Sequence, residues 1–144
     1  MRGNAGVDYP GRFARECEKS RLLAGASRVL VACSGGADST ALALLLAGYL
    51  ESLGEAAPAL YLGHVNHALR GDASDEDEAF ARELARGLGA EFLSLRLERG
   101  DGRETPGPLS EGEARELRYA AYRGWAAEHR LDCIATGHHR EDQQ

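Results

Sequence analysis

The sequence has little of what marks membrane-bound, secreted or general nucleic-acid-binding proteins. Its most apolar run, residues 41–50, is half of the roughly 20 residues that a membrane-spanning helix needs, and residues 1–15 contain no long apolar stretch. Only three cysteines occur, without a C-x-x-C pair, which favours reduced thiols in the cytosol. The net charge of −6 is opposite to the basic footprint of a general nucleic-acid binder. We therefore expect a cytoplasmic protein with no membrane partner.

What the sequence does contain is a regular alternation of short apolar runs and amphipathic segments. Its 144 residues suit one domain with a real core. The pattern predicts strands at 28–33, 59–65, 91–97 and 131–136, and helices at 10–24, 38–53, 74–87 and 110–129. Strands that alternate with helices of this length imply parallel β-α-β units. We therefore expect an α/β fold, an open and mostly parallel sheet with helices on both faces.

The helical stripes predict which side chains face the sheet. In the helix at 74–87, apolar residues recur every four positions, at Phe80, Leu84 and Leu88. The inner residues expected in the neighbouring helices are Leu42, Leu45, Leu46 and Tyr49 in one, and Ala114, Leu117, Ala121 and Trp125 in the other.

The first polar motif follows the strand at 28–33 and leads into the next helix; it consists of Ser34, Gly35, Gly36, Ala37, Asp38 and Ser39. Two glycines let the backbone turn sharply and bring N–H groups against phosphate oxygens. The following helix presents its free N–H groups and the positive end of its dipole to the same anion. Because the carboxylate of Asp38 would repel a phosphate, its place is explained if it holds Mg²⁺ or caps the helix. The spacing matches neither the Walker A motif nor the dinucleotide fingerprint.

The second motif stands at the carboxyl end of the strand at 59–65. Its hydrogen-bonding side chains are His64, Asn66 and His67, followed by Arg70. In isolation such a segment is more often a polar loop with one satisfied histidine. In an open α/β sheet, however, ligands bind beyond the carboxyl ends of the strands, beside the first motif. That position favours a substrate-binding role for these four residues.

The third motif is helical. Arg115, Arg118, Tyr119 and Tyr122 are spaced so that they share one face of the helix at 110–129. A solvated basic face is the competing interpretation, and it is strongest for Arg118. An arginine that faces the cleft would neutralise charge building up on a phosphate during transfer, which is the role we expect for Arg115.

The fourth motif, residues 136–144, follows the last predicted strand. His139 is a candidate substrate-binding residue, and Asp142 is a candidate second carboxylate that binds Mg²⁺ or orients the substrate. Helix capping explains Glu141 and Gln144 equally well, and we assign them no role.

Together the four motifs resemble those of the PP-loop ATP pyrophosphatases. The glycine turn resembles the S-G-G-x-D-S signature of that superfamily. Residues 64–70 resemble the H-V-[ND]-H-[GA]-L-R stretch of tRNA(Ile)-lysidine synthases, and residues 113–119 resemble their E-A-R-x-x-R-Y stretch. Residues 138–143 are similar to the H-H-x-D-D-Q sequence of the family, with Glu141 in place of the first aspartate.

This resemblance implies a function. Residues 1–144 would form an amino-terminal PP-loop ATP-binding domain with a Rossmann-like fold, truncated at its carboxyl side and without the later tRNA-binding domains. The implied reaction is adenylation of the wobble cytidine in tRNA(Ile) with a CAU anticodon, followed by displacement of AMP by free L-lysine. ATP and Mg²⁺ are the implied cofactors, with Asp38 and Asp142 on the metal and Tyr119 among the substrate-binding residues.

Three other readings stay open. Cytidine 2-thiolation of tRNA shares the glycine loop, but it relies on a cysteine pair that this sequence lacks. A nucleotide-binding sensor of the universal-stress type carries its glycine loop late in the domain. An amidotransferase would carry a glutaminase portion before the motif. The oligomeric state is not fixed by the sequence, and a homodimer stays open.

Overall fold

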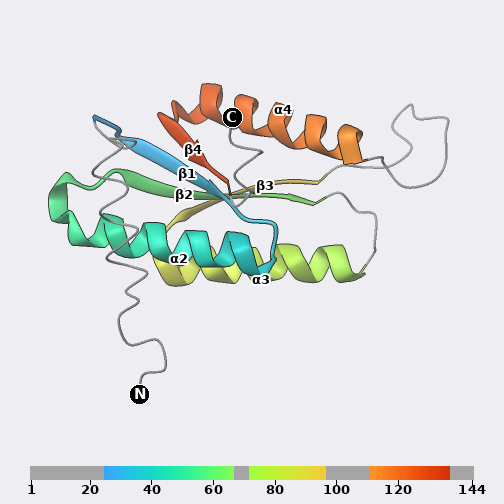
Figure 1. Cartoon of the computed structure of the whole chain (residues 1–144), viewed down its shortest axis with the longest axis horizontal. Coiled ribbons are helices and arrows are strands. Elements are labelled where there is room, and N and C mark those ends of the chain that lie inside the picture. The colour runs from blue at the N-terminus through green and yellow to red at the C-terminus, as the bar shows by residue number, and fades with distance from the viewer. Residues whose placement is uncertain (1–24, 67–71, 97–110, 137–144) are drawn as a thin grey trace, which may run out of the picture.

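The computed structural model describes residues 25–66, 72–96 and 111–136. Strands and helices alternate along this part of the chain (Figure 1). In order they are β1 (Arg28–Ala32), α2 (Ala37–Ser52), a 3-10 turn η1 (Gly54–Ala56), β2 (Ala59–Asn66), α3 (Asp72–Leu88), β3 (Glu91–Arg96), α4 (Glu111–His129) and β4 (Cys133–Ala135). These elements confirm the predicted ones to within a residue or two at each end, whereas the helix predicted at 10–24 lies outside the described residues. None of the helices in the described ranges is long and apolar enough to cross a membrane.

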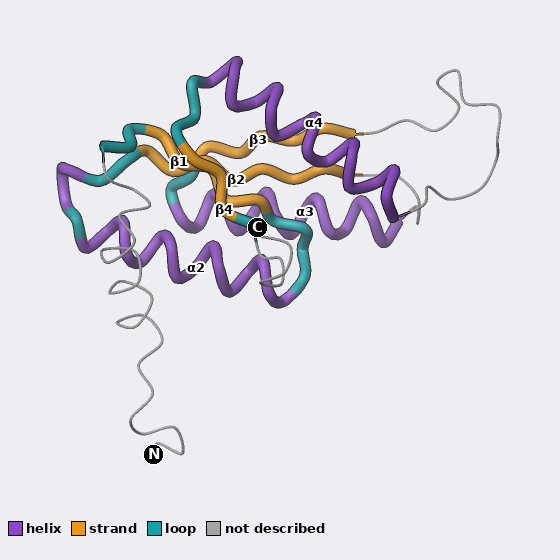
Figure 2. Tube along the Cα trace, turned by 45° about the horizontal axis from the view of Figure 1, so that its top comes forward, coloured by secondary structure: helices purple, strands orange, loops and turns teal. Residues whose placement is uncertain are grey.

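The strands form one parallel sheet in the order β3-β2-β1-β4. Helices α2 and α3 cover one face and α4 covers the other (Figures 1 and 2). The predicted α/β architecture is therefore confirmed. Because the chain adds β2 and β3 on one side of β1 and then returns to add β4 on the other side, the topological switch point lies between β1 and β4.

The larger part of the core lies between the sheet and the helices α2 and α3. Strand β1 is covered on both faces, which explains why its sequence is continuously apolar rather than alternating. On this face it contributes Val29 and Val31, and β2 contributes Leu62. The helical side chains buried against them are Ala43, Leu46, Leu50, Ala81 and Ala85.

In two helices the residues that face the sheet differ from the predicted ones. In α3 the expectation that Phe80 is buried is wrong: its side chain is 47% exposed, and Ala81 and Ala85 take the buried positions. Small alanines let the helix approach the sheet closely, with Leu84 and Leu88 packed at the flank. In α2 the buried residues are Ala43, Leu46 and Leu50, so of the four residues expected there only Leu46 is fully buried. Since α2 is apolar on nearly all sides, its pattern does not fix its rotation.

The smaller core cluster lies under α4. Tyr122, expected on the polar face of this helix, is 6% exposed and packs with Leu30 and Tyr61, so that expectation is wrong. Burial raises the pKa of the Tyr122 hydroxyl. Trp125 lies directly over Gly63, where a methyl group would come within 2.7 Å of the indole ring. The absence of a side chain at Gly63 is therefore what lets α4 dock on β2.

Candidate functional site

The turn after β1 has the conformation that a phosphate-binding loop needs. Gly35 has a φ of +96°, which lies in the region that favours glycine. Gly36 is the N-cap of α2, and no side chain caps the helix there. No side-chain cap therefore occupies the N–H groups of the first turn, which begins at Ala37, and N–H groups of this kind are suited to an anion.

Two serines hold this turn closed. The backbone N–H of Ser34 donates to Oγ of Ser39 at 3.0 Å, and the two hydroxyl oxygens are 3.2 Å apart. Oγ of Ser34 also accepts from the N–H of Gly36 at 3.3 Å. Ser39 is 7% exposed, whereas Ser34 and Asp38 face solvent. The exposed groups are thus the ones available to a ligand, and Ser39 serves the shape of the loop.

His64 lies beneath this turn, at the end of β2. Its side chain is 3% exposed, and Nδ1 is 2.8 Å from the carbonyl oxygen of Cys33. Because a carbonyl only accepts hydrogen bonds, Nδ1 is the donor in this contact. Nε2 has no hydrogen-bond partner among the described residues.

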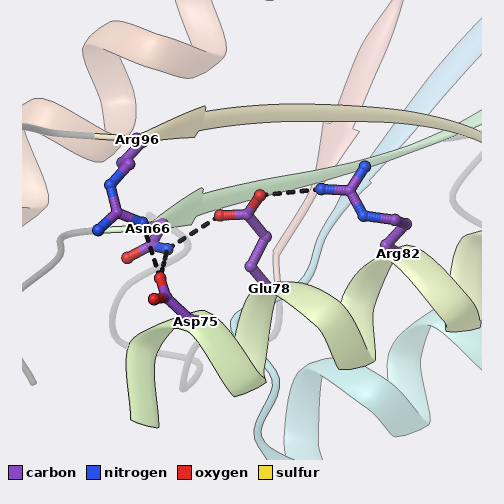
Figure 3. Close-up of polar contacts among 5 residues, drawn as sticks. All are labelled: Asn66, Asp75, Glu78, Arg82 and Arg96. Carbon is purple, nitrogen blue, oxygen red and sulfur yellow. Dashed lines mark hydrogen bonds and ion pairs between the residues drawn. The ribbon is translucent and has the colours of Figure 1, made fainter. Parts of the chain in front are cut away.

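Asn66 is the centre of a polar network between β2 and α3, shown in Figure 3. It is 1% exposed, and its Nδ2 donates to Oδ1 of Asp75 at 3.1 Å and to Oε1 of Glu78 at 2.9 Å. The guanidinium of Arg96 donates to the same oxygen of Asp75 at 2.7 Å, and Arg82 donates to Glu78 at 3.0 Å. The hydrogen bond from Arg96 and, to a smaller extent, the one from Asn66 hold the pKa of Asp75 below its usual range.

Asp77 is a residue of this region that sequence reasoning missed. It lies on α3 between the two carboxylates that bind Asn66, and a methyl group placed on Gly35 would meet its side chain at 3.1–3.2 Å. Helix α3 thus lies directly against the turn after β1. No local pattern announces this contact, because it depends on how α3 docks.

On the opposite face of the sheet, α4 carries the candidate residues Arg115 and Tyr119. The Arg115 guanidinium carbon lies 5.0 Å from the centre of the Tyr119 ring, which in turn packs edge-on against Tyr122 at 5.3 Å. A shallow pocket of about 280 Å³ is lined by Arg115, Glu116, Tyr119 and Arg123. Arg123 was not singled out from the sequence, although it continues the spacing of Arg115 and Tyr119 by one more turn.

Four candidate residues, His67, Arg70, His139 and Asp142, lie outside the described residues. Within the described ranges, no group of three or more His, Cys, Asp or Glu side chains is arranged to hold a metal ion. Of the two predicted Mg²⁺ ligands, Asp38 is described by the structure and Asp142 is not. The carboxylate of Asp38 stands in the first turn of α2, beside the uncapped N–H groups.

A glycine turn that leads from a buried central strand into an uncapped helix defines a nucleotide-phosphate-binding α/β domain. The sequence matches the family model described as a PP-loop domain over residues 11–144. The chain therefore belongs to the PP-loop family, and this membership implies an ATP-binding domain.

Curated relatives of the chain include tRNA(Ile)-lysidine synthases. The chain is 36% identical to that of Persephonella marina over 131 residues, which is 91% of this chain and 28% of the relative. It is 37% identical to that of Chlorobaculum tepidum over 131 residues, which is 91% of this chain and 39% of the relative. The chain thus spans well under half the length of the relatives it matches.

Two solved structures share the fold. A U34-tRNA thiolase, NcsA from Methanococcus maripaludis, superposes with a TM-score of 0.70 at 22% identity, covering 90% of this chain and 43% of that chain. An NH3-dependent NAD synthetase from Campylobacter jejuni gives a TM-score of 0.58 at 18% identity, covering 84% of this chain and 53% of that chain. At these identities the likeness concerns the fold alone.

Proposed function

We propose that this chain is the amino-terminal ATP-binding part of a cytoplasmic tRNA(Ile)-lysidine synthase. ATP binds at the turn after β1 and is split between its α and β phosphates. The wobble cytidine of a CAU-anticodon tRNA is adenylated, and the amine of free lysine then displaces AMP. The observation that carries the proposal is the uncapped start of α2 behind Gly35, together with the relationship to lysidine synthases.

The chemistry divides among the residues of the loop and of α4. Backbone N–H groups of Ala37 to Ser39 and the hydroxyl of Ser34 bind phosphate oxygens, whose negative charge suits these donors. Asp38 holds Mg²⁺, a hard cation that prefers carboxylate oxygens and shields the phosphates from one another. Arg115 stabilises the negative charge that builds up on the transferring phosphate. Asp142 is assigned to the same metal or to the substrate.

We expect the second substrate on the face of the sheet that α4 covers, opposite to the face covered by α2 and α3. Tyr119 and the two arginines that line the α4 pocket, Arg115 and Arg123, offer an aromatic ring and two positive charges to RNA. The overall negative charge of the chain is compatible with tRNA binding if most phosphate contacts lie in other parts of the enzyme.

The test is a nucleoside mass measurement. The longer gene product that contains this chain is incubated with a CAU-anticodon tRNA(Ile) transcript, ATP, Mg²⁺ and lysine. The RNA is then digested, and the masses of its nucleosides are measured by mass spectrometry. The proposal predicts a lysine-sized mass gain on one cytidine, with AMP and pyrophosphate released. Bound ATP without this gain would overturn the lysidine assignment and bring tRNA thiolation or an amidation reaction to the front.

A further inference from the structure

We infer that His64 and Asn66 position the phosphate loop and that neither side chain binds the second substrate. The inference rests on the proposed binding of ATP at that loop. Both residues belong to the polar end of β2, which the sequence alone marks as a substrate-binding segment. Their burial and their partners indicate a different role.

His64 fixes the residue that enters the loop. Strand β1 ends at Ala32, yet the N–H of Cys33 still donates to the carbonyl of Gly63 at 2.8 Å. The carbonyl of Cys33 accepts from Nδ1 of His64 at 2.8 Å. Both backbone polar groups of Cys33 are therefore bound by β2, one through the backbone and one through a side chain. The loop begins at the next residue, so its origin is held in place.

Asn66 fixes α3, which forms the wall of the loop. One amide nitrogen donates both of its hydrogens, to Asp75 and to Glu78, which share one side of the helix. Asp77 lies between these two residues in the sequence, and its side chain lies against Gly35. The position of α3 therefore decides how much space the loop has. A movement of α3 toward β1 would press on Gly35, and a movement away would remove the wall.

Direct binding of a substrate by these side chains does not fit their surroundings. Asn66 is 1% exposed and has no amide hydrogen left for a ligand. His64 is 3% exposed, and its Nε2, although without a partner among the described residues, is buried away from the surface where a substrate would arrive. The carboxylates around Asn66 are themselves paired, Asp75 with Arg96 and Glu78 with Arg82. The network is therefore balanced in charge without a ligand.

The first test compares two replacements of His64. Asparagine places an amide nitrogen where Nδ1 stands and keeps the donor to Cys33, whereas leucine fills similar space without a donor. We expect His64→Leu to weaken binding of a non-hydrolysable ATP analogue about tenfold, the scale of one hydrogen bond, and His64→Asn to recover most of the affinity. If His64 served only to fill the core, leucine would be the better replacement, and that order would overturn the inference.

The second test uses Asn66→Ala, with Arg82→Ala as its control. Both variants remove a donor to Glu78, but Arg82 is solvent-exposed and does not join α3 to β2 through a buried bond. We expect Asn66→Ala to weaken binding of the analogue about tenfold and Arg82→Ala to leave it unchanged. A variant that binds the analogue normally but loses affinity for tRNA would show direct substrate contact and overturn the inference.

Hydrogen exchange separates this inference from the proposed function. In the chain without nucleotide, we expect the amides of residues 34–39 to exchange faster in Asn66→Ala and His64→Leu than in wild type, while those of β1 stay protected. If wild type does not bind the analogue, the proposed function fails, and the exchange rates alone decide whether the two side chains position the loop. Unchanged exchange in both folded variants would overturn the inference.

Discussion

Gly35 combines two constraints that a side chain cannot meet. Its φ of +96° is unfavourable for any L-residue with a Cβ, and a methyl group there would meet Asp77 at 3.1–3.2 Å. We expect Gly35→Ala to destabilise the chain by about 1–2 kcal/mol and to weaken ATP binding by more than tenfold. Urea unfolding and a titration with the ATP analogue measure the two effects.

Gly48 is the matched control for this substitution. It lies inside α2, and a methyl group there would meet no atom within 4 Å. Gly48→Ala should therefore stabilise the chain by roughly 0.5–1 kcal/mol and leave ATP binding unchanged. Similar behaviour of the two alanine variants would contradict the special role of the turn.

Asp38 is the described residue whose charge matters most for the proposed metal. It is exposed in the first turn of α2, so Asp38→Asn keeps the size of the side chain and removes only its charge. We expect the variant to fold normally and the longer gene product to lose at least about 100-fold in turnover, since the loss of a charged group at a reacting phosphate typically costs that much. Activity is assayed across a range of Mg²⁺ concentrations, and unchanged turnover at saturating Mg²⁺ would refute the metal role.

Among the elements, β4 is attached to β1 by a carboxylate at the end opposite the site. Asp132 accepts the backbone N–H groups of Ser27 at 2.7 Å and Arg28 at 3.0 Å, and these bonds lower its pKa from the ordinary value of 3.8. A group with a lowered pKa in the folded state stabilises the fold above its ordinary pKa and loses that effect as the pH falls through its folded pKa.

The consequence is a pH-dependent effect of removing this carboxylate. We expect Asp132→Ala to lower the free energy of unfolding near neutral pH and the difference from wild type to shrink below pH 3.8. Urea titrations of both proteins between pH 7 and pH 3 measure it. A difference that stays constant over this range would show that the contribution of Asp132 is not tied to its charge.

Helix α4 presents a second element-scale prediction. If the side of α4 that carries Arg115, Tyr119 and Arg123 faces tRNA, Arg123→Glu should weaken tRNA binding about tenfold and lower the salt dependence by about one unit of slope or more, with ATP binding unchanged. Arg86→Glu on α3 makes the same charge change on the other face of the sheet, where Arg86 is exposed and pairs with Glu83. Filter binding at several salt concentrations compares the two variants. An equal loss of tRNA affinity in both would show that the change in net charge, and not the position of Arg123, causes the effect.

For the whole molecule, the sequence was informative wherever the signal is local. The apolar run of β1, the glycines after it and the alternation of apolar and amphipathic segments predicted the order of the elements, because each signal acts within a few residues. Properties that depend on docking were missed. The rotation of α2, the burial of Tyr122 and the contact of Asp77 with Gly35 are decided by how helices settle on the sheet. The polar end of β2 was correctly located near the loop, but its burial requires α3.

The two faces of the sheet differ in how much core they bury, and this difference predicts how the chain unfolds. Among the described residues, the α2/α3 face contains nine buried core residues and the α4 face four, while all three residues of β4 are only half-buried. Trp125, the single tryptophan, lies on α4 and reports its docking. We therefore expect tryptophan fluorescence to change at a lower urea concentration than the far-UV circular dichroism signal, because α4 and β4 detach before the rest. Coincident curves from the two probes would instead show that both faces unfold as one cooperative unit.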